Sequence, residues 1–152
     1  INPKLNIGDM IVATKLCQHD LDITAFGHPN GYVPGGKVFV DSSKELLEIA
    51  KKVAVTENLK VIEGVIATGD QFVHSNERKE FIEKTFNADA LEMEGASVAV
   101  VCDSLNVPFF ILRAISDSAN GEANFDFDEF LNSSAKISSN YLVKIVDELI
   151  KK

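Results

Sequence analysis

The amino-acid sequence predicts an α/β fold of three layers (α/β/α), in which helices cover both faces of a central mixed, largely parallel sheet. Short and almost continuously apolar segments alternate along the chain with longer segments whose apolar residues recur at helical spacing. Strands that are apolar on both faces are typical of parallel sheets buried between helices. The 152 residues suit a single domain, 1–152, without a linker, an internal repeat or a low-complexity stretch.

The first half of the chain is expected to form, in order, a strand, a loop, a short strand, a helix and a strand, at residues 7–16, 19–36, 38–40, 43–57 and 61–68. Gly8 and Asp9 lead into the first strand, which is rich in Ile, Val and Met. The loop is rich in Pro and Gly, which favour turns. Ser42 or Ser43 is the expected N-cap of the helix.

The second half is expected to form a helix, a short strand, a helix, a strand and a long helix, at residues 75–86, 90–93, 95–105, 109–115 and 127–150. Ser75 is the expected N-cap of the first of these helices, and Phe81, Ile82 and Phe86 are expected to face inward. The strand that follows residue 108 is the most hydrophobic of the chain. A continuous apolar stripe at helical spacing predicts the last helix.

Composition excludes several classes of function. The chain has 15 Lys and Arg against 23 Asp and Glu, a formal net charge of −8, which argues against a nucleic-acid-binding protein. No apolar run approaches the ~20 residues of a membrane span, and no signal peptide is recognisable, so no membrane contact and a cytoplasmic location are expected. Cys17 and Cys102 are expected to be reduced thiols. The three histidines lack the spacing of zinc ligands, so no metal site is expected.

Polar residues stand where three of the expected strands end, in the runs Thr68-Gly69-Asp70-Gln71-Phe72, Glu92-Met93-Glu94-Gly95 and Arg113-Ala114-Ile115-Ser116-Asp117. Ligands of open α/β sheets bind beyond the carboxyl ends of strands. Each run also has an ordinary structural interpretation. Asp70 suits a turn, Glu94 suits a helix N-terminus, and Asp117 suits a helix cap or a partner for Arg113.

Taken together, the three runs favour a small pocket for a nucleoside-like ligand. A carboxylic acid after a buried strand can be desolvated enough to donate a proton near neutral pH. Phe72 offers a face for stacking on a flat heterocycle, and Met93 offers an apolar floor. The glycine-rich loops of dinucleotide and nucleoside-triphosphate sites are absent from the sequence, and so is a Ser-His-Asp elbow.

The motifs resemble, in order, those of the 5′-methylthioadenosine/S-adenosylhomocysteine nucleosidases, especially the bacterial enzymes that also cleave 6-amino-6-deoxyfutalosine. The resemblance covers the whole chain and is carried by residues 8–9, 22–27, 68–73, 90–96, 107–109, 113–117 and 127–130. It implies a fold like that of the nucleoside phosphorylases and hydrolases. It also implies hydrolysis of an N-ribosidic bond with release of adenine, in the context of methionine salvage or menaquinone biosynthesis, without a metal or organic cofactor.

The resemblance implies a role for each matching residue at the bond that breaks. Asp117 corresponds to the acid that protonates adenine at N7, and Ser116 to the residue that helps to orient that acid. Glu94 corresponds to the carboxylate that holds the ribose hydroxyls. Met93 corresponds to the residue packed beneath the sugar.

Further roles concern the base, the 5′ substituent and the assembly. Phe72 corresponds to the residue that stacks on adenine, and the backbone of Val73 to the group that reads its edge. Phe127 corresponds to the residue that closes over the 5′ substituent. A homodimer is expected, in which three loop residues reach across the interface to line the neighbouring subunit's 5′ pocket: Ile23, Phe26 and Pro34.

The sequence departs from the family pattern at its start. In the family, a segment with the opening strands and a water-activating glutamate precedes the position of Ile1, so the chain is expected to be the C-terminal portion of a nucleosidase domain. Alone, it is expected to be inactive, with unpaired edges or apolar faces on the strands at 7–16 and 61–68. Two alternatives remain: a nucleoside phosphorylase of the same fold, and a non-catalytic fragment that binds adenine nucleosides or dimerises.

Overall fold

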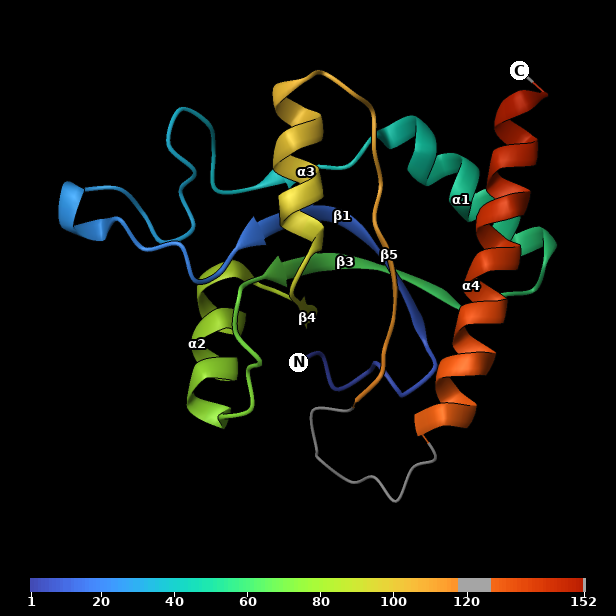
Figure 1. The fold of residues 1–152 in the computed structure, drawn as a ribbon, viewed down its shortest axis with the longest axis horizontal. Coiled ribbons are helices and arrows are strands. Elements are labelled where there is room, and N and C mark those ends of the chain that lie inside the picture. The colour runs from blue at the N-terminus through green and yellow to red at the C-terminus, as the bar shows by residue number, and fades with distance from the viewer. Residues whose placement is uncertain (118–126, 152) are drawn as a thin grey trace.

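The fold was analysed in a computed structural model that describes residues 1–117 and 127–151, with side chains from residue 131 onward in the second range. Within these residues, five strands form one mixed sheet (Figure 1). They are β1 (Met10–Gln18), β2 (Val40–Asp41), β3 (Val61–Thr68), β4 (Ala90–Glu92) and β5 (Leu112–Ala114). The order is β2-β1-β3-β4, and β5 also pairs with β1.

The two long strands lie in the middle of this sheet. β3 is parallel to β1 on one side and to β4 on the other. β5 pairs antiparallel with residues 10–12 of β1, and β2 pairs antiparallel with residues 15–16, so the two short strands share its second edge. The expectation of an unpaired edge is therefore wrong for β1, which has strand partners on both edges. It holds for the first part of β3, because β4 pairs only with residues 66–68 and residues 61–65 have no strand partner on that edge among the described residues.

Four helices cover the sheet: α1 (Lys44–Thr56), α2 (Asn76–Phe86), α3 (Gly95–Ser104) and α4 (Phe127–Ile150). α3 packs on one face, against Ile11, Leu16 and Ile66. The opposite face packs on α1 and α4 through Met10. It packs on α2 through Cys17. This arrangement confirms the predicted three-layer α/β/α fold (Figure 1).

A β-bulge in β1 decides which side chains face α3. The pairing register with β3 shifts between Ala13 and Lys15, and the Thr14 hydroxyl between them donates to the Gly64 carbonyl oxygen at 3.1 Å. Because one extra residue is inserted, Leu16 rather than Lys15 points toward α3. Lys15 instead lies over the Phe39 ring, with its ammonium 4.2 Å from the ring centroid.

Hydrogen-bonding side chains fix several element boundaries. Ser43 accepts from the Leu46 N–H at 3.4 Å and Ser75 from the Arg78 N–H at 3.3 Å, which confirms both as N-caps. The buried Tyr141 hydroxyl donates to the Ala50 carbonyl oxygen at 2.7 Å and joins α4 to α1. Burial raises the pKa of Tyr141 to about 12.

Two details of the predicted elements are corrected. Phe81 is exposed, because only residues four apart, Ile82 and Phe86, reach the sheet from α2; the Arg78 guanidinium lies over the Phe81 ring at 4.8 Å. The short strand β2 begins at Val40 rather than at residue 38. No helix within the described part of the chain is both long and apolar enough to cross a bilayer.

Candidate active site

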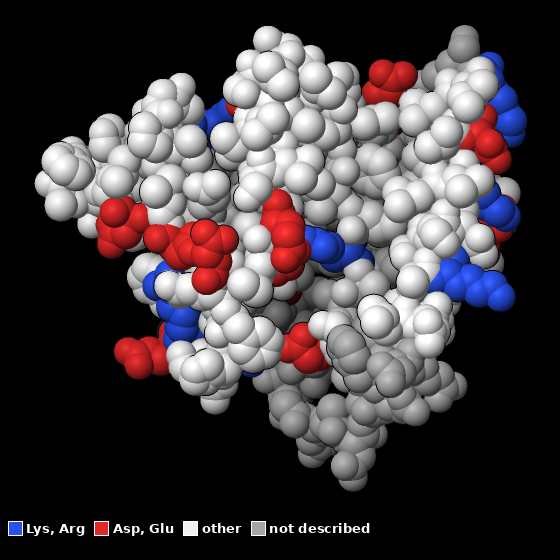
Figure 2. All heavy atoms as spheres, in the orientation of Figure 1, with Lys and Arg blue, Asp and Glu red and all other residues white. Residues whose placement is uncertain are grey.

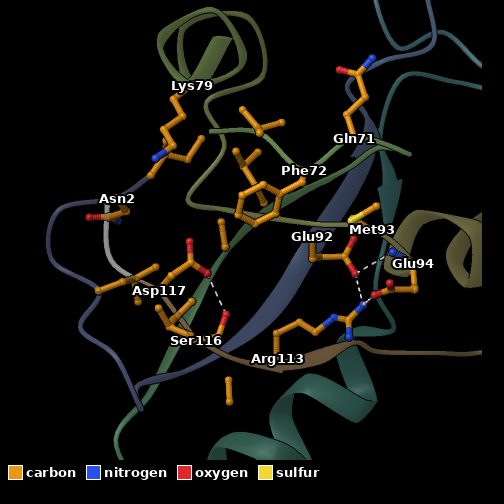
Figure 3. A pocket seen from close by; sticks show the side chains of 17 residues that line it. Asn2, Gln71, Phe72, Lys79, Glu92, Met93, Glu94, Arg113, Ser116 and Asp117 are labelled. Carbon is orange, nitrogen blue, oxygen red and sulfur yellow. Dashed lines mark hydrogen bonds and ion pairs between the residues drawn. The ribbon is translucent and has the colours of Figure 1, made fainter. Parts of the chain in front are cut away.

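A cavity of about 330 Å³ lies beside β4 and the end of the chain segment that contains β5 (Figure 3). Its lining comes from the start of the chain, from the loop after β3 together with α2, from β4 and the turn that follows it, and from β5 with the residues beyond it. All three polar runs that the sequence analysis selected therefore contribute to one cavity. On the face shown in Figure 2, acidic and basic side chains meet at a central hollow.

Six of the residues predicted for the site line this cavity: Phe72, Val73, Met93, Glu94, Ser116 and Asp117. The Phe72 ring is 74% exposed and Met93 is 41% exposed, which leaves both apolar surfaces available to a ligand. Figure 3 shows Phe72 between two polar groups of the cavity, one around Asp117 and the other around Glu94. This order suits an elongated ligand whose flat ring stacks on Phe72 and whose polar groups reach Asp117 and Glu94.

One polar group consists of Ser116 and Asp117. The Ser116 hydroxyl donates to Asp117 Oδ1 at 2.8 Å (Figure 3). Both residues are exposed, so the expected burial of the Asp117 carboxyl group is not observed. Arg113 does not pair with Asp117, because its ion pairs lead to the other side of the cavity.

The other polar group contains three charged residues, Glu92, Glu94 and Arg113. The Arg113 Nη2 atom forms ion pairs with the carboxylates of both glutamates (Figure 3). The Glu92 side chain is 11% exposed, whereas the Glu94 side chain is 69% exposed. Glu92 is therefore the buried member of this group, and Glu94 is the member that a ligand can reach.

The charges of Glu92 and Arg113 are stabilised by their partners. Burial alone would raise the pKa of Glu92, but hydrogen bonds from Thr68 and Arg113, aided by the Gly95 N–H, hold that pKa below its ordinary value. Burial alone would lower the pKa of Arg113, but its bonds to both glutamates raise that pKa. Both groups are therefore ionised at neutral pH.

Four residues predicted for the site are not placed in this cavity. Ile23, Phe26 and Pro34 belong to the loop between β1 and β2, which contains the 3₁₀ turn η1 (Thr24–Phe26) and extends away from the sheet (Figure 1). Phe26 is 81% exposed there. Phe127 begins α4, but its side chain lies outside the described residues.

Sequence reasoning assigned no role to four other polar residues of the cavity: Asn2, Gln71, Lys79 and Glu92. It considered Arg113 only as a partner of Asp117. The repeated glutamates around Met93 were a usable signal, because residues two apart leave a strand on the same side. Arg113 was a second usable signal, because a charged residue inside the most hydrophobic strand requires a partner of opposite charge. Among the described residues, no cluster of three or more His, Cys, Asp or Glu could hold a metal ion.

Comparison with known proteins places the chain in a family. The sequence profile of the phosphorylase superfamily matches residues 1–151. The chain belongs to the phosphorylase superfamily. Within this superfamily it is 56% identical over 148 residues to the aminodeoxyfutalosine nucleosidase of Campylobacter jejuni, covering 97% of this chain and 65% of that protein. It is 44% identical over 147 residues to the 5′-methylthioadenosine/S-adenosylhomocysteine nucleosidase of Bacillus cytotoxicus, covering 95% and 64%.

A solved structure of the superfamily has the same fold. The crystal structure of the 5′-methylthioadenosine/S-adenosylhomocysteine nucleosidase of C. jejuni matches with a TM-score of 0.94 and 55% identity, over 97% of this chain and 65% of that one. The chain thus spans slightly less than two-thirds of the length of these phosphorylase-superfamily relatives. The similarity to nucleosidases that the sequence motifs indicated is confirmed.

Proposed function

We propose that the protein hydrolyses the N-ribosidic bond of adenine nucleosides and releases adenine. The substrates we propose are 5′-methylthioadenosine, S-adenosylhomocysteine and 6-amino-6-deoxyfutalosine. The observation that carries this proposal is the cavity in which Phe72 lies between Asp117 and Glu94, in a chain similar to nucleosidases throughout its length. Phe72 can stack on a flat base, Glu94 on one side of it can bind the hydroxyls of the attached sugar, and Asp117 on the other side can donate a proton to the base.

Asp117 and Ser116 act on the leaving base. When the bond between C1′ and N9 breaks, its electron pair moves to the base, and the sugar acquires oxocarbenium character. Asp117 acts as the general acid and transfers a proton to N7, so adenine leaves as a neutral molecule. A positioned acid of this kind contributes ~10²–10⁴ to the rate. The Ser116 hydroxyl, which donates to Oδ1 at 2.8 Å, fixes the rotation of the carboxyl group.

Glu94 binds the sugar. Its exposed carboxylate can accept hydrogen bonds from two ribose hydroxyls, and these charge-assisted bonds fix the ring above Met93. The negative charge of Glu94 also favours the cationic sugar of the transition state. Water adds to C1′ and releases a proton to the solvent, and Asp117 takes up a proton from the solvent, so the products are adenine and the free ribose derivative and the protein is restored.

Adenine release by the full-length protein tests this proposal. Each nucleoside is incubated with the protein in phosphate-free buffer and in phosphate buffer, and both products are separated by liquid chromatography. We expect adenine and the free sugar at equal rates in both buffers. Release that requires phosphate and yields a sugar 1-phosphate would instead assign a phosphorylase, and no release in either buffer would contradict both activities.

We also propose that the protein acts as a homodimer in the cytoplasm. Large apolar side chains are exposed on the loop, on α3 and at the residue that follows α3, namely Phe26, Val98, Val101 and Leu105. A second copy of this face would bury them. Ile23, Phe26 and Pro34 would then line the 5′ pocket of the neighbouring subunit. Both cysteines are free thiols, which suits a reducing compartment.

A further inference from the structure

The Glu92 carboxylate has four polar partners, which come from different segments of the fold. Its Oε1 atom accepts from the Thr68 hydroxyl, and its Oε2 atom accepts from the Gly95 N–H at 2.7 Å and the Glu94 N–H at 3.1 Å. The same Oε2 atom forms the ion pair with Arg113. One carboxylate therefore joins the ends of β3 and β4, the start of α3 and the β5 segment.

These contacts replace the usual cap of α3. Glu94 occupies the N-cap position, but its side chain makes no capping hydrogen bond. The carboxylate of Glu92, two residues earlier, accepts the free N–H groups instead. As a result, the Glu94 carboxylate does not cap the N–H groups of α3 and remains exposed to the cavity.

Gly95 makes this arrangement possible. A Cβ atom at this position would lie 2.8 Å from Leu16 Cδ2 and 3.1 Å from both carboxylate oxygens of Glu92. A larger residue would thus force either the core side chain or the capping carboxylate to move. The glycine lets the Glu92 carboxylate approach the first turn of α3.

The orientation of Arg113 depends on the two glutamates. Its Nη2 atom contacts both carboxylates, whereas its buried Nε atom has no hydrogen-bond partner among the described residues. Removal of the Glu92 charge would leave Arg113 paired with Glu94 alone. The guanidinium would then compete with the sugar hydroxyls for the Glu94 carboxylate.

We propose that Glu92 is a positioning residue, which holds Arg113 in place and thereby keeps the Glu94 carboxylate available to the ribose of the substrate. This inference rests on the proposed nucleosidase function and adds a residue to it. Glu92 does not touch the reacting atoms in this account. It acts through Arg113, so its effect on turnover should disappear when Arg113 is removed.

A double-mutant cycle tests this dependence in the full-length protein. Glu92→Gln keeps the shape but removes the charge, and we expect kcat/KM for 5′-methylthioadenosine to fall about tenfold or more. In the Arg113→Met background the same change should cost less than about twofold. Glu63→Gln is the matched control, because Glu63 pairs with Lys51 at 3.0 Å and does not line the cavity; it should leave kcat/KM unchanged.

If Glu92 positions Arg113, the double-mutant cycle gives a different result than if Glu92 only caps α3. An equal loss from Glu92→Gln in both backgrounds would show that the residue only caps the helix, and an unchanged kcat/KM would equally overturn the proposal. The ¹⁵N signal of the Arg113 Nε–H group gives a second readout that needs no turnover. It should shift in Glu92→Gln and not in Glu63→Gln, and an unchanged signal overturns the proposal. If the unsubstituted protein releases no adenine, the proposed function fails, while this signal still decides the role of Glu92.

Discussion

The Ser116 hydroxyl donates a hydrogen bond of 2.8 Å to Asp117 Oδ1, and both residues line the cavity beside the β5 segment. This contact fixes one carboxylate oxygen and leaves Oδ2 for the proton that the base receives. The proposed acid is thus oriented by its own neighbour in the sequence. Its orientation does not depend on Arg113, which pairs with the two glutamates.

Ser116→Ala removes the orienting bond and leaves the acid in place. We expect kcat to fall several-fold, about three- to tenfold, because the carboxyl group then samples unproductive rotations. KM should change less than kcat, since Ser116 is not proposed to hold the ribose. Steady-state kinetics of adenine release measure both constants. A loss as large as that of an Asp117 substitution would mean that Ser116 itself acts on the substrate.

Glu94→Gln removes the charge that is proposed to hold the ribose. We expect kcat/KM to fall by about 10²-fold, because charge-assisted bonds to two hydroxyls and the attraction to the cationic sugar are both weakened. The companion measurement uses free adenine, which has no sugar. Its affinity, measured by calorimetry, should stay within about twofold. Equal losses for nucleoside and adenine would place Glu94 at the base instead.

The charge of Glu92 makes stability depend on pH. Its pKa in the folded protein lies below the ordinary value of 4.5, so the stabilisation is fully present above that value and is lost as the pH falls through the lower, folded pKa. Glu92→Gln lacks this contribution. The difference in free energy of unfolding between the two proteins should therefore be constant near neutral pH and shrink below about pH 4.5. Urea denaturation from pH 7 to pH 3 measures it, and a difference that grows on acidification would contradict this assignment.

Phe26→Asp tests the proposed dimer. The ring is 81% exposed in the single chain, so a charge there costs the monomer little. At an interface it would bury an unpaired carboxylate and should weaken association by about 10²-fold or more. Light scattering at micromolar concentration should give a dimer for the unsubstituted protein and a monomer for the variant. Val55→Asp on α1, also highly exposed, is the control that should remain dimeric.

The sequence could predict elements whose signal is local. The boundaries of β3 and α4 agree with the prediction, because a buried strand and an amphipathic helix each show their own periodicity. The N-cap at Ser43 is equally local. β2 and β5 were less predictable, since two- and three-residue strands are defined by pairing with β1 rather than by their own residues.

The site could be predicted in part for the same reason. Runs of polar residues after apolar strands located Phe72, Glu94 and Asp117 in one cavity. The pairing of Arg113 with Glu92 could not be predicted, because it joins residues 21 positions apart through a long side chain. The proposed roles of the loop residues, such as Phe26, involve a second chain, so the geometry of a single chain carries no signal for them.

Asp117 is proposed to protonate the leaving base. Asp117→Asn keeps the size of the side chain and removes the transferable proton. In the full-length protein, with 5′-methylthioadenosine as substrate, we expect kcat to fall ~10²-fold or more. The affinity for adenine should stay within about tenfold, because stacking on Phe72 and the backbone of Val73 are unaffected. A kcat close to that of the unsubstituted protein would contradict the account, and would reduce Asp117 to the acceptor of the Ser116 hydrogen bond.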